Sequence, residues 1–104
     1  MSEQSIAEVL ETALAGHRAL RLVALARLAT IGPAAAEASP GLRSIHLDPD
    51  PEIRAGVYLA LSAIATPSTE TFDALAQALK MEADPSLRPL IAHAMEAVSR
   101  PSSP

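Results

Sequence analysis

Three histidines are the chain's only side chains suited to proton transfer near neutral pH. His17, His46 and His93 lie in different segments. No two of them have the i, i+4 spacing that places two metal ligands on one face of a helix. Three unrelated surface or capping histidines are therefore the expected arrangement. We predict neither a catalytic site nor a metal site from them.

The carboxylates Asp48, Asp50 and Glu52 form a second cluster that suggests calcium binding. Two interleaved prolines and the lack of a glycine-containing loop do not fit an EF-hand, and anions that cap helices explain the cluster better. The chain has no cysteine, no glycine-rich phosphate loop, no Gly-x-Ser-x-Gly elbow and no His-Glu-x-x-His. We expect a protein that is not an enzyme and binds no cofactor.

Composition favours one all-α domain. The 104 residues are 49% hydrophobic, with one Phe, one Tyr and no Trp, so the core must be built mainly from Ala and Leu. A net charge of −4 with a single lysine disfavours nucleic-acid binding. There is no secretory signal, and the longest apolar run, 55–65, is about half of the ~20 residues that span a bilayer. We expect a cytoplasmic protein with no membrane contact.

Periodicity and capping residues indicate helices at 5–15, 17–31, 51–65, 68–82 and 85–99, with a shorter irregular helical region at 33–49. Ser5 with Glu8 resembles a capping box, and Asp50 precedes a proline at a helix start. The apolar residues expected to face the core are Ile6, Val9, Leu10, Ala13, Leu14, Leu20, Ala24, Leu25, Leu28, Ile31, Leu42, Ile45, Leu47, Val57, Ala60, Leu61, Ile64, Phe72, Leu75, Leu79, Met81, Ile91, Ala94, Met95 and Val98.

The motif Asp-Pro-x-apolar-Arg occurs twice, at 50–54 and again at 84–88. Arg21 precedes Arg54 by nearly the same interval that separates Arg54 from Arg88. Apolar residues follow each of these arginines at +3, +7 and +10. This regular interval predicts three stacked helical hairpins, at about 5–32, 33–65 and 67–99, in one domain of residues 1–100 with a disordered tail at 101–104.

The pattern resembles the HEAT-like repeat, in the variant first recognised in phycobilisome lyases. Its signature reads roughly Asp-Pro-x-Val-Arg, a small residue, Ala-Leu and an apolar-Gly end. The first unit departs from it, because His17 replaces the Asp and Arg27 stands where a small residue is expected. Arg18 offers an alternative register there, and we prefer Arg21. The resemblance implies a right-handed α-α superhelix, with a structural ladder formed by Arg21, Asp50, Arg54, Asp84 and Arg88.

Because of helical geometry, the side chains at +1, +5 and +8 from each arginine point away from the core. In HEAT-like arrays these second helices line the concave side, which predicts an apolar strip across a groove. Three alternatives account for such a strip. It binds a helix or peptide of a partner, with Tyr58 and Leu59 as anchors, or it binds a second copy of the chain. In the third alternative the solenoid curls tightly and covers the strip itself. The residues of this predicted groove are Leu22, Ala26, Ala29, Ala55, Tyr58, Leu59, Ser62, Pro89, His93 and Glu96.

These features together predict a non-catalytic protein-interaction module or small scaffold. The alternative is an accessory, lyase-like protein that handles a small molecule or prosthetic group, as the resemblance implies. A DNA-binding array similar to the HEAT-like alkylpurine glycosylases would need a basic groove, which an acidic chain does not provide.

Overall fold

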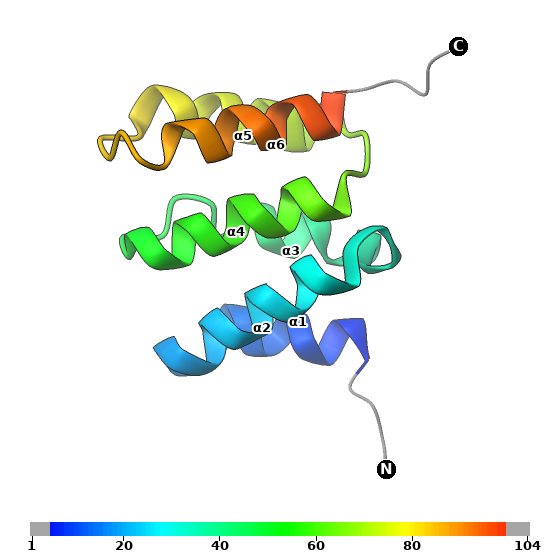
Figure 1. Ribbon diagram of the computed structural model, residues 1–104. Helices are drawn as coiled ribbons and strands as arrows, with labels where there is room; N and C mark the ends of the chain where they lie inside the picture. Colours follow the sequence, from blue (N-terminus) through cyan, green and yellow to red (C-terminus); the bar gives the residue numbers. More distant parts are fainter. Residues whose placement is uncertain (1–4, 100–104) are drawn as a thin grey trace.

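Three helical hairpins lie on one another in the computed structural model, which describes residues 5–99 (Figure 1). No strand occurs within this range, so the predicted all-α class is confirmed. The predicted tail at 101–104 lies outside the described residues. The elements are α1 (Ile6–Ala15), α2 (Arg18–Ile31), the 3₁₀ helix η1 (Gly32–Ala38), α3 (Ser39–Arg43), α4 (Pro51–Ile64), α5 (Thr69–Met81) and α6 (Arg88–Ser99).

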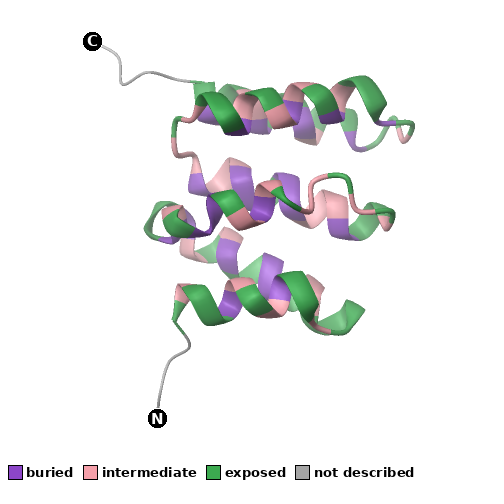
Figure 2. Cartoon of the chain, turned by 180° about the vertical axis from the view of Figure 1, so that it is seen from behind, coloured by how far each residue is buried: buried purple, intermediate pink, exposed green. Residues whose placement is uncertain are grey.

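The hairpins form two layers of helices. The second helices α2, α4 and α6 lie side by side, with α4 packed between the other two (Figure 1). The first layer contains α1, α3 and α5, and α3 contacts both of the others. Buried residues line the sides of the helices that face other helices (Figure 2).

Side-chain caps set the starts of three helices. Ser5 accepts from the Glu8 amide while the Glu8 carboxylate accepts from the Ser5 amide, which completes the predicted capping box. Asp50 accepts from the Glu52 amide at the start of α4, and Ser68 accepts from the Thr71 amide at the start of α5.

The first helix of the middle hairpin is irregular, as Pro33, Pro40 and Gly41 predict. Gly32 ends α2 with a φ of 71°, and the chain continues as the 3₁₀ helix η1. Ala35 then departs from helical geometry, with φ −94° and ψ 21°, before the short α3 buries Leu42. This hairpin therefore contributes only short elements to the first layer.

Four residues that we expected in the core are exposed instead. The exposed fractions are 36% for Leu14, 41% for Leu47, 62% for Met81 and 52% for Leu20. The first three lie beside the turns between paired helices, at the edge of the stack, where no neighbouring helix covers them.

Leu20 is exposed for a different reason, which the middle hairpin shows. Its equivalent there, Ile53, is 1% exposed, and Gly56 in the same helix lies against Leu25 of the first hairpin. Counted from the repeated arginine, the residues at −1 and +2 thus face the preceding hairpin. Within the described residues no hairpin precedes the first one, so Leu20 has no cover.

Candidate protein-binding surface

The repeated arginines join one hairpin to the next. Arg21 of the first hairpin donates from Nη2 to Oδ2 of Asp48 in the second, at 3.0 Å. Arg54 of the second donates from Nε and Nη2 to the two carboxylate oxygens of Glu82 in the third, at 3.0 and 2.9 Å. Arg21 and Arg54 thus occupy equivalent places, which confirms the register that prefers Arg21 over Arg18.

Each arginine also binds carbonyl groups of its own hairpin. Arg54 donates from Nη1 to the carbonyls of Asp48 and Pro49. Arg88 donates from Nη1 to the carbonyls of Leu79, at 2.9 Å, and Glu82, at 3.3 Å. A planar guanidinium with several fixed donors can make both sets of bonds at once, which a lysine cannot.

The carboxylates that receive these arginines are Asp48 and Glu82, which the sequence reasoning missed. We expected Asp50 and Asp84 in this role. Each instead accepts from the amide two residues on at 2.9 Å, and Asp50 also pairs with Arg18 of the preceding hairpin rather than with Arg21. The signal was present, since Asp48 and Glu82 recur at the spacing of the arginines and each lies six positions before its hairpin's arginine.

These contacts shift the acidity of the carboxylates. Burial raises the pKa of Glu82, but the hydrogen bonds from Arg54 and from the Asp84 amide outweigh it, so the pKa is lowered. The Arg18 guanidinium, bonded at 2.5 Å, lowers the pKa of Asp50. Hydrogen bonds from Ser86 lower the pKa of Asp84. All three groups are therefore held in their ionised form.

Tyr58, which we expected as an exposed anchor, is fully buried, and this prediction is wrong. Its hydroxyl donates to the carbonyl of His46 at 2.9 Å, and burial raises its pKa to about 12. Tyr58 lies four positions after Arg54, as Leu25 lies four after Arg21, and both face the following hairpin. A helix inside a stack is covered on its inner side and also on the two sides that face the neighbouring hairpins. Tyr58 is on one of these sides.

The other residues of the predicted groove vary in exposure. Leu59 is 49% exposed on α4, the middle second helix. The remaining exposed members are Ala26, Pro89, His93 and Glu96, and the half-buried members are Leu22, Ala29, Ala55 and Ser62. We call this set, with Leu59 and without Tyr58, the second-helix face.

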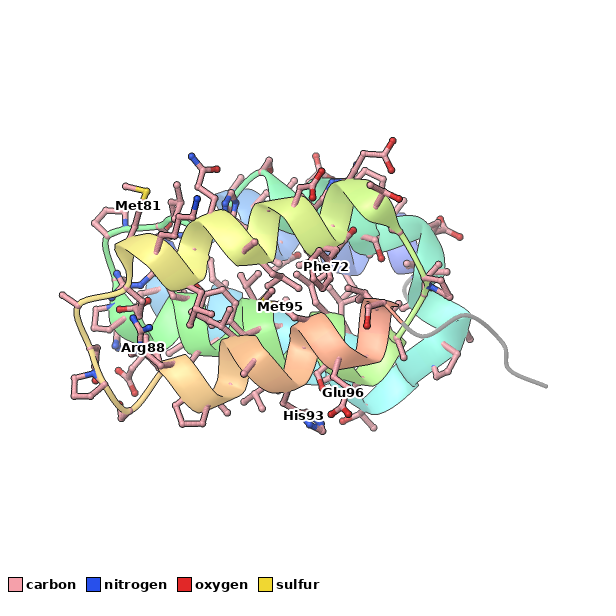
Figure 3. The ribbon with its side chains drawn as sticks, turned by 90° about the horizontal axis from the view of Figure 1, so that it is seen from above. Phe72, Met81, Arg88, His93, Met95 and Glu96 are labelled. Carbon is pink, nitrogen blue, oxygen red and sulfur yellow. The ribbon has the colours of Figure 1, made fainter. Side chains whose placement is uncertain are left out.

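A shallow hollow lies at one end of the second-helix face. It has a volume of about 430 Å³ and is lined by Ala65, His93, Glu96 and Ala97. His93 and Glu96 point to the same side of α6 (Figure 3). They add a polar margin to a strip that is otherwise apolar except for Ser62.

A second surface follows the turn edge of the stack. Leu14, Leu47 and Met81 recur at the repeat spacing, each seven positions before the arginine of its hairpin. A hollow of about 280 Å³ is lined by residues that include Leu47, Met81, Arg54 and Glu82. We call the three apolar side chains the turn-edge stripe, and periodicity alone placed them in the core.

The histidines do not converge on a common site. His17 and His93 are exposed, whereas half-buried His46 has Nδ1 2.5 Å from the carbonyl of Arg43 and no partner at buried Nε2. Among residues 5–99, no three His, Cys, Asp or Glu side chains could together hold a metal ion. The carboxylates at 48, 50 and 52 instead pair with Arg18 and Arg21.

One helical stretch of the described chain, Arg18–Arg43, has the length and mean hydropathy, 1.4, of a membrane span. A core helix of a folded protein passes the same test, and Gly32 interrupts this stretch with a left-handed φ. The stretch is therefore weak support for a membrane contact.

A scan against protein families matches residues 6–96 to the model for HEAT repeats. The chain belongs to the HEAT-repeat family. Comparison with curated proteins and with solved structures finds no significant match. HEAT repeats generally mediate protein–protein interaction or scaffolding and are generally not enzymes. The phycobilisome-lyase subtype, and the small-molecule role that it implies, stay predictions.

Proposed function

We propose that this HEAT-repeat protein is a non-catalytic binding module that receives a helix or peptide of a partner protein on its second-helix face. The observation that carries the proposal is Leu59, a large apolar side chain 49% exposed at the centre of α4. A folded chain gains nothing by leaving such a side chain in water among other apolar groups, and such patches commonly mark interaction sites.

The small side chains around Leu59 support a helical partner. Ala26, Ala55 and Ser62 project little from their helices, so a partner backbone can approach closely. His93 and Glu96 then offer polar contacts at the margin. A second copy of the chain is the alternative occupant of the same face, and a solution mass distinguishes the two.

The test is Leu59→Glu in the full-length chain. Because Leu59 lies outside the core, we expect helicity and melting temperature to stay nearly unchanged while partner capture, or a dimer seen by solution mass, is lost. The matched control is Leu47→Glu, which places the same charge on the turn-edge stripe. Unfolding by Leu59→Glu would show that Leu59 belongs to the core, and loss of binding only with Leu47→Glu would move the site to the turn edge.

A further inference from the structure

In the first two hairpins, three positions of the second helix face the following hairpin. Counted from the repeated arginine, they are the arginine itself, +4 and +7. The apolar residues there are Leu25, Leu28, Tyr58 and Leu61, and none is more than 1% exposed. In both cases the following hairpin therefore closes the apolar part of this face.

Among the described residues, nothing covers the same face of the third hairpin. Arg88 and Ala92 are exposed and Met95 is half-buried. Viewed onto this end of the stack, Met95 and Phe72 lie between α5 and α6, and Arg88 lies at the turn end of α6 (Figure 3). We call Arg88, Ala92, Met95 and Phe72 the end face.

Within the described chain, the end face lacks the carboxylate that pairs with the repeated arginine in the other two hairpins. Arg21 binds a carbonyl of its own hairpin and a carboxylate of the next, and Arg54 binds two carbonyls and a carboxylate in the same way. Arg88 makes only the carbonyl bonds, and no carboxylate within residues 5–99 pairs with it. The side chain of Arg54 is 17% exposed once paired, whereas Arg88 stays exposed. A partner carboxylate would complete the third rung as Glu82 completes the second.

We propose that the end face docks a helical hairpin of a partner protein whose inter-helix turn places a carboxylate on Arg88. The partner also supplies a large apolar side chain over Ala92, where the inner interfaces have Leu25 and Tyr58 on this chain's side. This site is separate from the second-helix face and does not depend on it.

A second copy of the chain stacked head to tail does not fit this position. In the first hairpin, the residue six positions before Arg21 is Ala15, where the later hairpins have Asp48 and Glu82. Head-to-tail stacking of two copies would therefore leave Arg88 without the carboxylate that the ladder pattern requires.

The probe is a yeast-displayed library of helical hairpins patterned on residues 69–99, with the turn position of Glu82 and the docking positions randomised. Selection against the full-length chain is expected to enrich Asp or Glu at that turn position. Arg88→Gln should weaken the selected binders about ten- to hundredfold, the loss expected for a charge-assisted pair. Lys80→Gln, which removes the same charge from the same hairpin, should leave binding unchanged.

Ala92→Glu serves as a second variant because it alters an exposed helix position without removing any bond of Arg88. It should abolish binding of the same hairpins while far-UV circular dichroism and melting temperature are kept. Failure to select any binder, binders without an acidic turn, or binders indifferent to Arg88→Gln and Ala92→Glu would overturn the proposal. A dimer of the full-length chain that Arg88→Gln dissociates would also overturn it, because a second copy would then occupy the face.

Discussion

At the scale of single residues, Glu82 joins the third hairpin to the second through its ion pair with Arg54. Its side chain is 2% exposed and binds the Arg54 fork with both oxygens. Glu82→Gln keeps the shape but replaces one charged acceptor with an amide, so Arg54 loses part of its pairing. We expect a loss of about 1–3 kcal/mol in the free energy of unfolding, measured by urea denaturation. Glu96→Gln, at an exposed position, is the matched control, and an equal loss there would show that the ladder adds nothing specific.

The same carboxylates make stability depend on acid. Glu82, Asp50 and Asp84 have a lower pKa in the folded chain than the ordinary values of 4.5 for Glu and 3.8 for Asp. The unfolded chain therefore binds more protons. The stabilisation is fully present above these ordinary values and is lost as pH falls from them through the lower pKa values of the folded chain. We expect the free energy of unfolding to drop as pH falls below about 5, and Glu82→Gln to flatten that drop. A Glu82→Gln profile parallel to that of the original chain would contradict this role.

At the scale of the elements, two equivalent helix ends should both favour glycine, so opposite exchanges at them should change stability in opposite directions. Gly32 ends α2 with φ 71° and ψ −140°, a region essentially restricted to glycine, so Gly32→Ala should cost about 1–3 kcal/mol. The added methyl would lie 3.6 Å from the Ala63 carbonyl, an ordinary contact, so conformation alone sets this cost. Ala65 ends α4 in the left-handed region with φ 55°, so Ala65→Gly should gain about 0.5–1 kcal/mol. Thermal melts of both variants test the pair, and two shifts of the same sign would refute it.

Much of the element level was predictable because local signals set it. Capping side chains and glycines fixed the helix ends, and the regular spacing of the arginines fixed the pairing of helices into hairpins. Helical periodicity, however, separates only an inner from an outer side, whereas a helix in a stack has two further flanks. Tyr58 and Leu20 were misplaced for this reason: one flank is covered by the next hairpin, and the other has no hairpin beyond it among the described residues. The carboxylates Asp48 and Glu82 lie outside the helices, where helical periodicity carries no information, and only their recurrence at the repeat spacing indicates their role.

For the whole molecule, the middle hairpin should hold the outer two together. Helix α4 packs on α2 on one side and on α6 on the other, and Leu61 lies in it with 1% exposure. Leu61→Ala removes contacts on the flank facing the third hairpin and should cost about 2–5 kcal/mol. If the stack unfolds as one cooperative unit, native-state hydrogen exchange will accelerate in α2 and α6 as well as in α4. Met95→Ala changes the equivalent position on the uncovered end, so its effect should be smaller and confined to α5 and α6. Acceleration limited to α4 in Leu61→Ala would instead mean that the hairpins open independently, and the arginine–carboxylate bridges would then align neighbours without coupling their stability.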